Sequence, residues 1–218
     1  MRLLHISDTH GFIPKLDLDG IDAVIHSGDF APNKTRGWIP IEESFQRDWY
    51  HANRDELCDM VPYRIPFLVC RGNHDFTNPA DHLGGMQAYD LSNKLVEIGG
   101  LKFFGFPYTP WFTGEWWGEL TKEQEEYAME ALLLVLERDK PDVFVSHGPM
   151  YGVLDQNLDY EYCGSSRLRN LLMHQTTHLP KVMLHGHIHE SAGKTVMTSV
   201  GREMRVYNSA TIVQVVEV

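Results

Sequence analysis

The 218-residue chain has few cysteines, no long apolar run and fewer basic than acidic residues. Its longest apolar run, Ala131–Leu136, is far shorter than the roughly 20 residues that a membrane-spanning helix needs. The N-terminus, MRLLHISDTH, places a histidine and an aspartate where a secretory signal peptide has an apolar stretch. The three cysteines, Cys58, Cys70 and Cys163, have no CxxC spacing, which fits a reducing compartment. We therefore expect a cytoplasmic protein that does not bind membranes.

The charge balance narrows the classes of binding partner. Nineteen basic and thirty acidic residues give a net charge of −11. This balance argues against extended nucleic-acid binding, because binding to a polyanion depends on Lys and Arg. A small phosphorylated substrate remains compatible with it, since a bound metal ion reverses the local charge. The length predicts one domain, residues 1–218, with an ordinary hydrophobic core.

Five short apolar segments are typical of strands buried on both faces. They are Leu3–Ile6, Ala23–Ile25, Phe67–Cys70, Val143–Val145 and Val182–Leu184. Each is followed by a polar cluster, and in chain order these read SDTHG, HSGDF, RGNHD, SHGP and HGHIH. In open α/β sheets, ligand sites form at the carboxyl ends of the strands. The pattern therefore predicts an α/β protein with one polar site assembled from five strand ends.

The remaining segments predict helices and antiparallel strands. Helices are expected over Glu42–Leu57 and Thr121–Arg138, the latter opening with Thr121 and Glu123, and a third over Gly164–His174. A hairpin is expected from Lys94–Ile98 and Lys102–Phe106, on either side of Gly99-Gly100. An antiparallel run is expected from Val196–Ser199, Glu203–Tyr207 and Ile212–Val218, with a turn at Val200-Gly201-Arg202. The aromatic-rich stretch 107–120 has no clear period and predicts an ordered loop.

The polar clusters together offer the donor atoms of a metal site. The candidate ligands are Asp8, His10, Asp29, Asn73, His147, His187 and His189. Oxygen donors mixed with imidazoles suit borderline divalent cations such as Mn, Fe, Zn and Ni. Seven ligands are too many for one tetrahedral zinc ion. They suit two cations that share a bridging carboxylate, an arrangement that activates water and stabilises phosphoryl transfer.

In order along the chain, Asp8-x-His10, Gly28-Asp29, Gly72-Asn73-His74-Asp75, His147 and Gly186-His187-x-His189 resemble the five-block signature of calcineurin-like metallophosphoesterases. A closer resemblance is to the metallophosphoesterase-domain proteins first noted in animal brain. The segments Pro107–Phe112 and Asn208–Thr211 contribute to it. The resemblance implies a four-layer α/β/β/α sandwich, in which two mixed sheets are flanked by helices.

The family resemblance also implies a role for each residue. One divalent metal ion would be held by Asp8, His10, Asp29 and His189, and the second by Asp29, Asn73, His147 and His187. Asp29 would bridge the two ions. His74 would face the substrate, stabilise the charge of the transition state and protonate the leaving oxygen.

The implied activity is hydrolysis of small phosphodiesters, with cyclic nucleotides among the candidates, by in-line attack of a hydroxide that bridges the two metals. A phosphomonoesterase, including a protein phosphatase, would have the same ligands, and a nuclease is a third enzymatic alternative. A catalytically silent scaffold is a fourth alternative. Such scaffolds typically lack His74 or a metal ligand, whereas this chain has the full set.

Other residues are candidates for substrate contacts or for support of the site. Three arginines could neutralise phosphate: Arg71, Arg167 and Arg169. Four aromatic residues could form a lip that stacks on a nucleobase, or could pack over a sheet edge: Trp111, Phe112, Trp116 and Trp117. Residues next to the motifs could support the ligands or close the site: His5, His26, Asp75, His185, Asn208 and Ser209.

Overall fold

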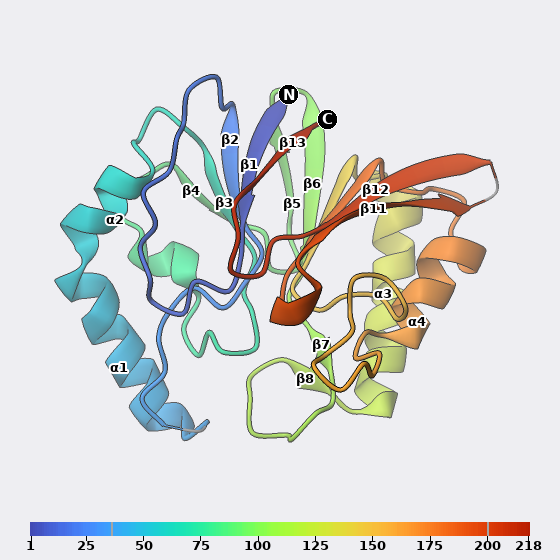
Figure 1. Ribbon diagram of the computed structural model, residues 1–218, viewed down its shortest axis with the longest axis horizontal. Coiled ribbons are helices and arrows are strands. Elements are labelled where there is room, and N and C mark those ends of the chain that lie inside the picture. Colours follow the sequence, from blue (N-terminus) through green and yellow to red (C-terminus); the bar gives the residue numbers. More distant parts are fainter. Residues whose placement is uncertain (36, 200) are drawn as a thin grey trace.

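The computed structural model describes residues 1–35, 37–199 and 201–218, and most of its strands form two large sheets that face each other (Figure 1). The first sheet has the strand order β13-β1-β2-β3-β4. Its strands are β1 (Arg2–Ile6), β2 (Ala23–His26), β3 (Phe67–Val69), β4 (Ala88–Asp90) and β13 (Gln214–Glu217). Strands β1 to β4 are parallel, and β13 pairs antiparallel with β1, so the sheet is mixed.

The second sheet has the order β11-β12-β10-β9-β6-β5 and is also mixed. Its strands are β5 (Leu95–Ile98), β6 (Leu101–Phe106), β9 (Val143–Ser146), β10 (Val182–His185), β11 (Gly193–Ser199) and β12 (Arg202–Asn208). The four central strands are parallel, and both edge strands, β5 and β11, are antiparallel to their neighbours. A separate parallel pair, β7 (Thr109–Pro110) and β8 (Glu119–Leu120), flanks a loop beside this sheet.

Alternating side chains along the buried strands divide the core into layers. In β1, Leu3 belongs to the cluster between the two sheets, whereas Leu4 packs on the outer, helix-covered face. In β9, Val143 and Val145 face the first sheet, and Phe144 faces the opposite way. Both faces of these strands are therefore buried, as their continuous apolar sequences predict.

Helices cover the outer face of each sheet, which completes the predicted four-layer sandwich (Figure 1). Helices α1 (Ile39–Ala52) and α2 (Arg54–Met60) pack on the first sheet. Helix α3 (Lys122–Asp139), helix α4 (Ser166–Asn170) and the π-helical turn Leu171–Gln175 pack on the second. Short 3₁₀ turns occur at Pro79–His82 and His189–Ser191. Within the described ranges, no helix combines the length and the apolar composition needed to cross a bilayer.

Three local predictions differ from the structure. The helix expected over Glu42–Leu57 is divided at Asn53, where the backbone leaves the helical conformation and the side-chain amide donates to the Trp49 carbonyl. The segment Gly164–His174 forms a short α-helix followed by a π-helical turn.

The third difference concerns the C-terminal strands. Strands β11 and β12 are antiparallel partners as predicted, but β13 joins the opposite sheet beside β1. The Val218 N–H donates to the Met1 carbonyl at 2.9 Å, so both ends of the chain lie at the same sheet edge. In the predicted turn between β11 and β12, Val200 lies outside the described residues.

Helix α3 begins with a capping box formed by Thr121 and Gln124. The Thr121 hydroxyl accepts a hydrogen bond from the Gln124 N–H, and the Gln124 side chain accepts one from the Thr121 N–H. Glu123, two residues after Thr121, takes no part in the box.

Removing this cap is expected to destabilise the protein measurably. Thr121→Ala should lower the free energy of unfolding by about 1 kcal/mol, since the Gln124 backbone N–H loses its acceptor at the helix start. Thr121→Ser keeps the hydroxyl and is the matched control. Urea unfolding measures both variants, and equal stabilities for the Ala and Ser variants would contradict a role for the cap.

Candidate metal centre

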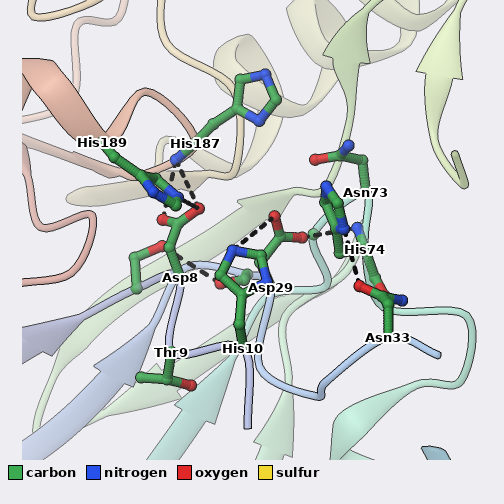
Figure 2. A network of polar contacts seen from close by, with 12 residues as sticks. Asp8, Thr9, His10, Asp29, Asn33, Asn73, His74, His187 and His189 are labelled. Carbon is green, nitrogen blue, oxygen red and sulfur yellow. Dashed lines mark hydrogen bonds and ion pairs between the residues drawn. The ribbon is translucent and has the colours of Figure 1, made fainter. Parts of the chain in front are cut away.

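The five polar clusters meet at one edge of the sandwich, because each follows a parallel strand whose carboxyl end lies there. Figure 2 labels residues from four of these clusters. Strands β1, β2 and β3 of the first sheet precede the clusters at 8–10, 28–29 and 72–75. Strands β9 and β10 of the second sheet precede His147 and the 186–189 segment. Contacts such as the His187 N–H with the Asp8 carboxylate, at 2.9 Å, join the two sets.

The donor atoms form three overlapping groups, each within 4.8 Å of one another. In the part of the chain that the structure describes, the groups are Asp8–His10–His189, His10–Asp29–His74 and Asp29–His147–His187. Asn73 joins the last group, because its side-chain oxygen lies 2.8 Å from His147 Nε2. All seven predicted ligands and His74 are therefore in one place, and Asp29 and His10 each belong to two of the three groups.

The backbone at the site adopts conformations that residues other than glycine rarely take. Asp8, His10, Asp29 and His187 have φ angles of 54°, 44°, 58° and 72°. Such left-handed conformations cost of order 1–3 kcal/mol each and persist where the surrounding contacts impose them. Gly186 is required for a different reason, since a Cβ there would collide with Ser7 and with the Asp8 carboxylate. The chain thus accepts local strain to bring the donor atoms together.

His147 shows most directly that the cluster requires positive charge. Its Nδ1 lies 3.0 Å from the Ser27 carbonyl, which can only accept, so Nδ1 carries a proton. In a neutral ring, Nε2 would then have only a lone pair. It faces two further acceptors, the Asn73 oxygen at 2.8 Å and the Asp29 carboxylate at 3.3 Å, and the contacts would be repulsive. Burial lowers the pKa of His147, but the charges of Asp29 and Asp8 outweigh it and raise this pKa to about 9. A cation belongs at this point, and the donor set fits a divalent metal.

The two buried carboxylates have the charge that such a cation would balance. Asp8 and Asp29 are almost completely buried. Burial alone would raise the pKa of Asp8, but the hydrogen bond from His189 and the charge of His147 lower it to about 2. The pKa of Asp29 is also well below its usual value, because His147 and His74 overcome the effect of burial. Both groups are therefore ionised at neutral pH.

His74 is held by contacts that the sequence did not reveal. Its Nδ1 lies 2.8 Å from the Asn33 side-chain oxygen, and its backbone N–H donates to Asp29 at 2.7 Å. Its carbonyl accepts from the side-chain amides of Asn33 and of Gln46, which lies on α1. Asn33 follows a proline in a polar turn and matches no motif, so only the buried polar face of the neighbouring helix hints at this role.

Asp75 organises the loops rather than contacting the donor cluster. Its carboxylate accepts four backbone N–H bonds, from Gly72 and from residues 29, 30 and 31, at 2.9–3.1 Å. Burial, together with the charge of Asp29, raises the pKa of Asp75 to about 6. One side chain thereby fixes the loop after β2 to the loop after β3. The sequence suggested a supporting role for Asp75.

The buried histidines beside the motifs support the same loops. His5 bridges the Ser27 and Ser209 hydroxyls at 2.9 and 2.7 Å. His26 Nδ1 accepts from the Gly28 N–H, so its Nε2 donates to the Thr9 hydroxyl at 3.0 Å. These contacts agree with the supporting role that the sequence suggested.

The three arginines considered for phosphate binding are engaged elsewhere. Arg71 donates to the carbonyls of Asp75 and Phe76, each at 2.6 Å. Arg167 pairs with Glu125 and Glu126, and Arg169 donates to the Tyr151 carbonyl. Asn208 was a sequence candidate for closing the site, but its side-chain amide donates to the carbonyls of Leu154 and Ile188.

Comparison with known proteins gives an independent view of the chain. Residues 1–191 match the family described as calcineurin-like phosphoesterase. Metallophosphoesterase domain-containing protein 1 of Homo sapiens is 24% identical over 220 residues, covering 88% of this chain and 61% of the human protein. Its Mus musculus counterpart gives the same values.

A UPF0046 protein of Caenorhabditis elegans is 27% identical over 212 residues, which cover 88% of this chain and 65% of the worm protein. The chain thus spans less than two thirds of the length of the relatives that it matches. The family match extends over all five polar clusters, which end at His189. With its two mixed sheets and its cluster of carboxylates and imidazoles, the chain belongs to the calcineurin-like metallophosphoesterase family.

Proposed function

We propose that this chain hydrolyses phosphodiester bonds of small molecules and uses two divalent cations. The observation that carries the proposal is the position of Asp29, whose carboxylate lies within 4.8 Å of donor atoms from both expected ligand sets, His10 of one and His147 and His187 of the other. One carboxylate shared between two ligand sets is the arrangement that places two cations a few ångströms apart. Membership of a phosphoesterase family supports the reaction class.

The ligand sets follow from the resemblance and agree with the contacts. Asp8, His10, Asp29 and His189 would hold one cation, and Asp29, Asn73, His147 and His187 the other. Mn, Fe, Zn and Ni all suit such mixed oxygen and nitrogen donors. Bound there, the cations supply Lewis acidity to the phosphate and lower the pKa of water. Asn73 contributes a neutral oxygen, so its set has less negative charge than one with a further carboxylate.

His74 is placed to handle the proton of the leaving group. Its Nδ1 donates to the Asn33 side-chain oxygen, so Nε2 is the nitrogen free to face a substrate. To protonate a leaving oxygen, Nε2 must also carry a proton, so His74 would act as the imidazolium. Burial lowers the pKa of His74, which makes this form a stronger acid but a less populated one at neutral pH. Trp116 lies against the ring, with 3.9 Å between ring centroids, and limits its rotation. Asn33 and Trp116 therefore act as positioning residues.

A diester is favoured over a monoester as the substrate, because the three candidate arginines already bind other groups of the protein. A phosphomonoester carries up to two negative charges at neutral pH, whereas a diester carries one. Arg71, Arg167 and Arg169 are bound to carbonyls or to glutamates, so they supply no free guanidinium for the second charge. Nucleotide diesters, including cyclic ones, are within the proposed substrate class.

The proposal is tested with a substrate panel on protein reconstituted separately with Mn, Fe, Zn or Ni. We expect kcat/KM for bis(p-nitrophenyl) phosphate to exceed that for p-nitrophenyl phosphate with at least one metal. A ratio below one with every metal would favour the phosphomonoesterase. Single-stranded oligonucleotides are included, and their efficient cleavage would favour a nuclease.

Loss of the shared carboxylate is expected to affect both cations. Asp29→Ala should lower the metal content from two ions per chain toward zero, because the same side chain serves both sets. Elemental analysis after dialysis measures the ratio, and the exposed Asp48 on α1 provides the control variant Asp48→Ala. Retention of one full equivalent by the Asp29 variant would contradict the bridging role.

His74→Ala is expected to reduce turnover while the metal content stays unchanged. A decrease of roughly 10²–10⁴-fold in kcat is usual when a general acid is removed. His51→Ala, at an exposed position, is the matched control and should retain the wild-type rate. If His74→Ala turns over at the wild-type rate, another group protonates the leaving oxygen.

A further inference from the structure

An aromatic loop between β7 and β8, residues 111–118, lies against the donor cluster. The Phe112 ring centroid is 5.0 Å from that of His187, and the Trp116 centroid is 3.9 Å from that of His74. The loop thus contacts imidazoles that follow strands of both sheets. Covering a sheet edge does not explain these contacts, because both partner rings belong to the site.

The outer part of this loop keeps large apolar rings in contact with solvent. Phe112 is 42% exposed and Trp111 is 53% exposed. Exposed aromatic surface beside a cluster of polar ligands is typical of a binding surface, since burial would otherwise stabilise the fold. The two residues are adjacent in sequence, and one of them already touches a predicted metal ligand.

The loop is held in shape by a buried carboxylate. Glu119 is nearly inaccessible, and its Oε2 accepts from the backbone N–H groups of Phe112, Thr113 and Gly114. The Trp111 ring is backed by Gly114, where a Cβ would collide with it. The exposed rings are therefore fixed before a ligand arrives, so ordering the loop adds little entropic cost to binding.

The far end of the loop is anchored by contacts of the Trp117 ring. The Arg71 guanidinium lies 3.5 Å from the centroid of the Trp117 ring, and Tyr108 stacks near that ring at 6.0 Å. Arg71 is itself fixed by its bonds to the carbonyls of Asp75 and Phe76. These contacts occupy Trp117 within the protein, which leaves Trp111 and Phe112 as the rings available to a ligand.

We propose that the aromatic loop binds a planar aromatic ring carried by the substrate, with Phe112 and Trp111 stacking on it. This inference rests on the proposed function, because the phosphate has to lie at the donor cluster for its ester group to reach Phe112. It narrows the substrate class to phosphodiesters with an aryl or nucleoside group and disfavours purely alkyl esters. The loop would recognise the flat face of the substrate's ring, because Phe112 and Trp111 offer it apolar, aromatic surfaces.

Binding of two phosphonates tests the loop without any turnover, because a hydrolase does not cleave their P–C bond. Calorimetry on the metal-loaded protein compares phenylphosphonate with methylphosphonate. We expect phenylphosphonate to bind about three- to tenfold more tightly, because stacking on an aromatic side chain increases affinity by about this factor. Phe112→Ala and Trp111→Ala should each reduce this ratio toward one. Tyr127→Ala, at an exposed tyrosine on α3, is the matched control and should keep it.

Kinetics separate failure of this inference from failure of the proposed function. The substrates are bis(p-nitrophenyl) phosphate and methyl p-nitrophenyl phosphate, which share a leaving group and differ in the second ester group. We expect the ratio of their kcat/KM values to fall at least threefold in Phe112→Ala and to stay constant in Tyr127→Ala.

Metal-dependent hydrolysis with the same ratio in wild type and Phe112→Ala would overturn the aromatic surface and leave the proposed function standing. A second outcome is that the protein hydrolyses no diester but still binds phenylphosphonate more tightly than methylphosphonate, and loses this preference in Phe112→Ala. That outcome would overturn the proposed function and support the aromatic surface. An equal affinity of the wild-type protein for both phosphonates would also overturn the surface.

Discussion

The structure of the site depends on two carboxylates, Asp8 and Asp29, that are buried where the two sheets meet. Isolated buried charges are strongly unfavourable, so such groups need nearby positive charge. Here imidazoles surround them, and the pKa of the buried His147 rises to about 9 although burial opposes its protonation. The strained backbone at Asp8 and Asp29 helps to hold these two carboxylates close together. A fold that keeps this arrangement is suited to bind divalent cations.

The sandwich explains how residues distant in sequence reach this point. Parallel strands deliver their carboxyl ends to a common edge, and face-to-face packing brings the edges of both sheets together (Figure 1). Asp75 then fixes two loops of the first sheet to each other through four N–H bonds. Across the sheets, the His187 N–H to Asp8 and His147 to Asn73 complete the connection. The donor cluster is therefore a property of the whole fold.

Much of this arrangement could be predicted from the sequence. Each strand is a short apolar run, and each run ends in residues such as Asp8 or His147, so chemistry and position appear together. The four layers required the family resemblance, because alternating strands and helices indicate only an α/β class. The pairing of β13 with β1 depends on contacts between chain ends more than 200 residues apart, which local patterns do not encode.

The contacts around His74 were the least predictable part. Asn33 lies 41 residues from His74 and matches no motif, and its role becomes visible only through the 2.8 Å contact with the ring. The first helix ends at Asn53, where the backbone leaves the helical conformation, although the apolar period continues past it. The positions of Phe112 and Trp116 also depend on a loop without periodicity. These features come from tertiary contacts and not from local propensity.

The central claim, that two cations bind at this edge and share Asp29, is tested most directly by anomalous diffraction from crystals grown with Mn²⁺. The account predicts two anomalous peaks roughly 3.5–4 Å apart, with the Asp29 carboxylate between them. A single peak, or peaks that lie away from Asp8, Asp29 and His147, would contradict it.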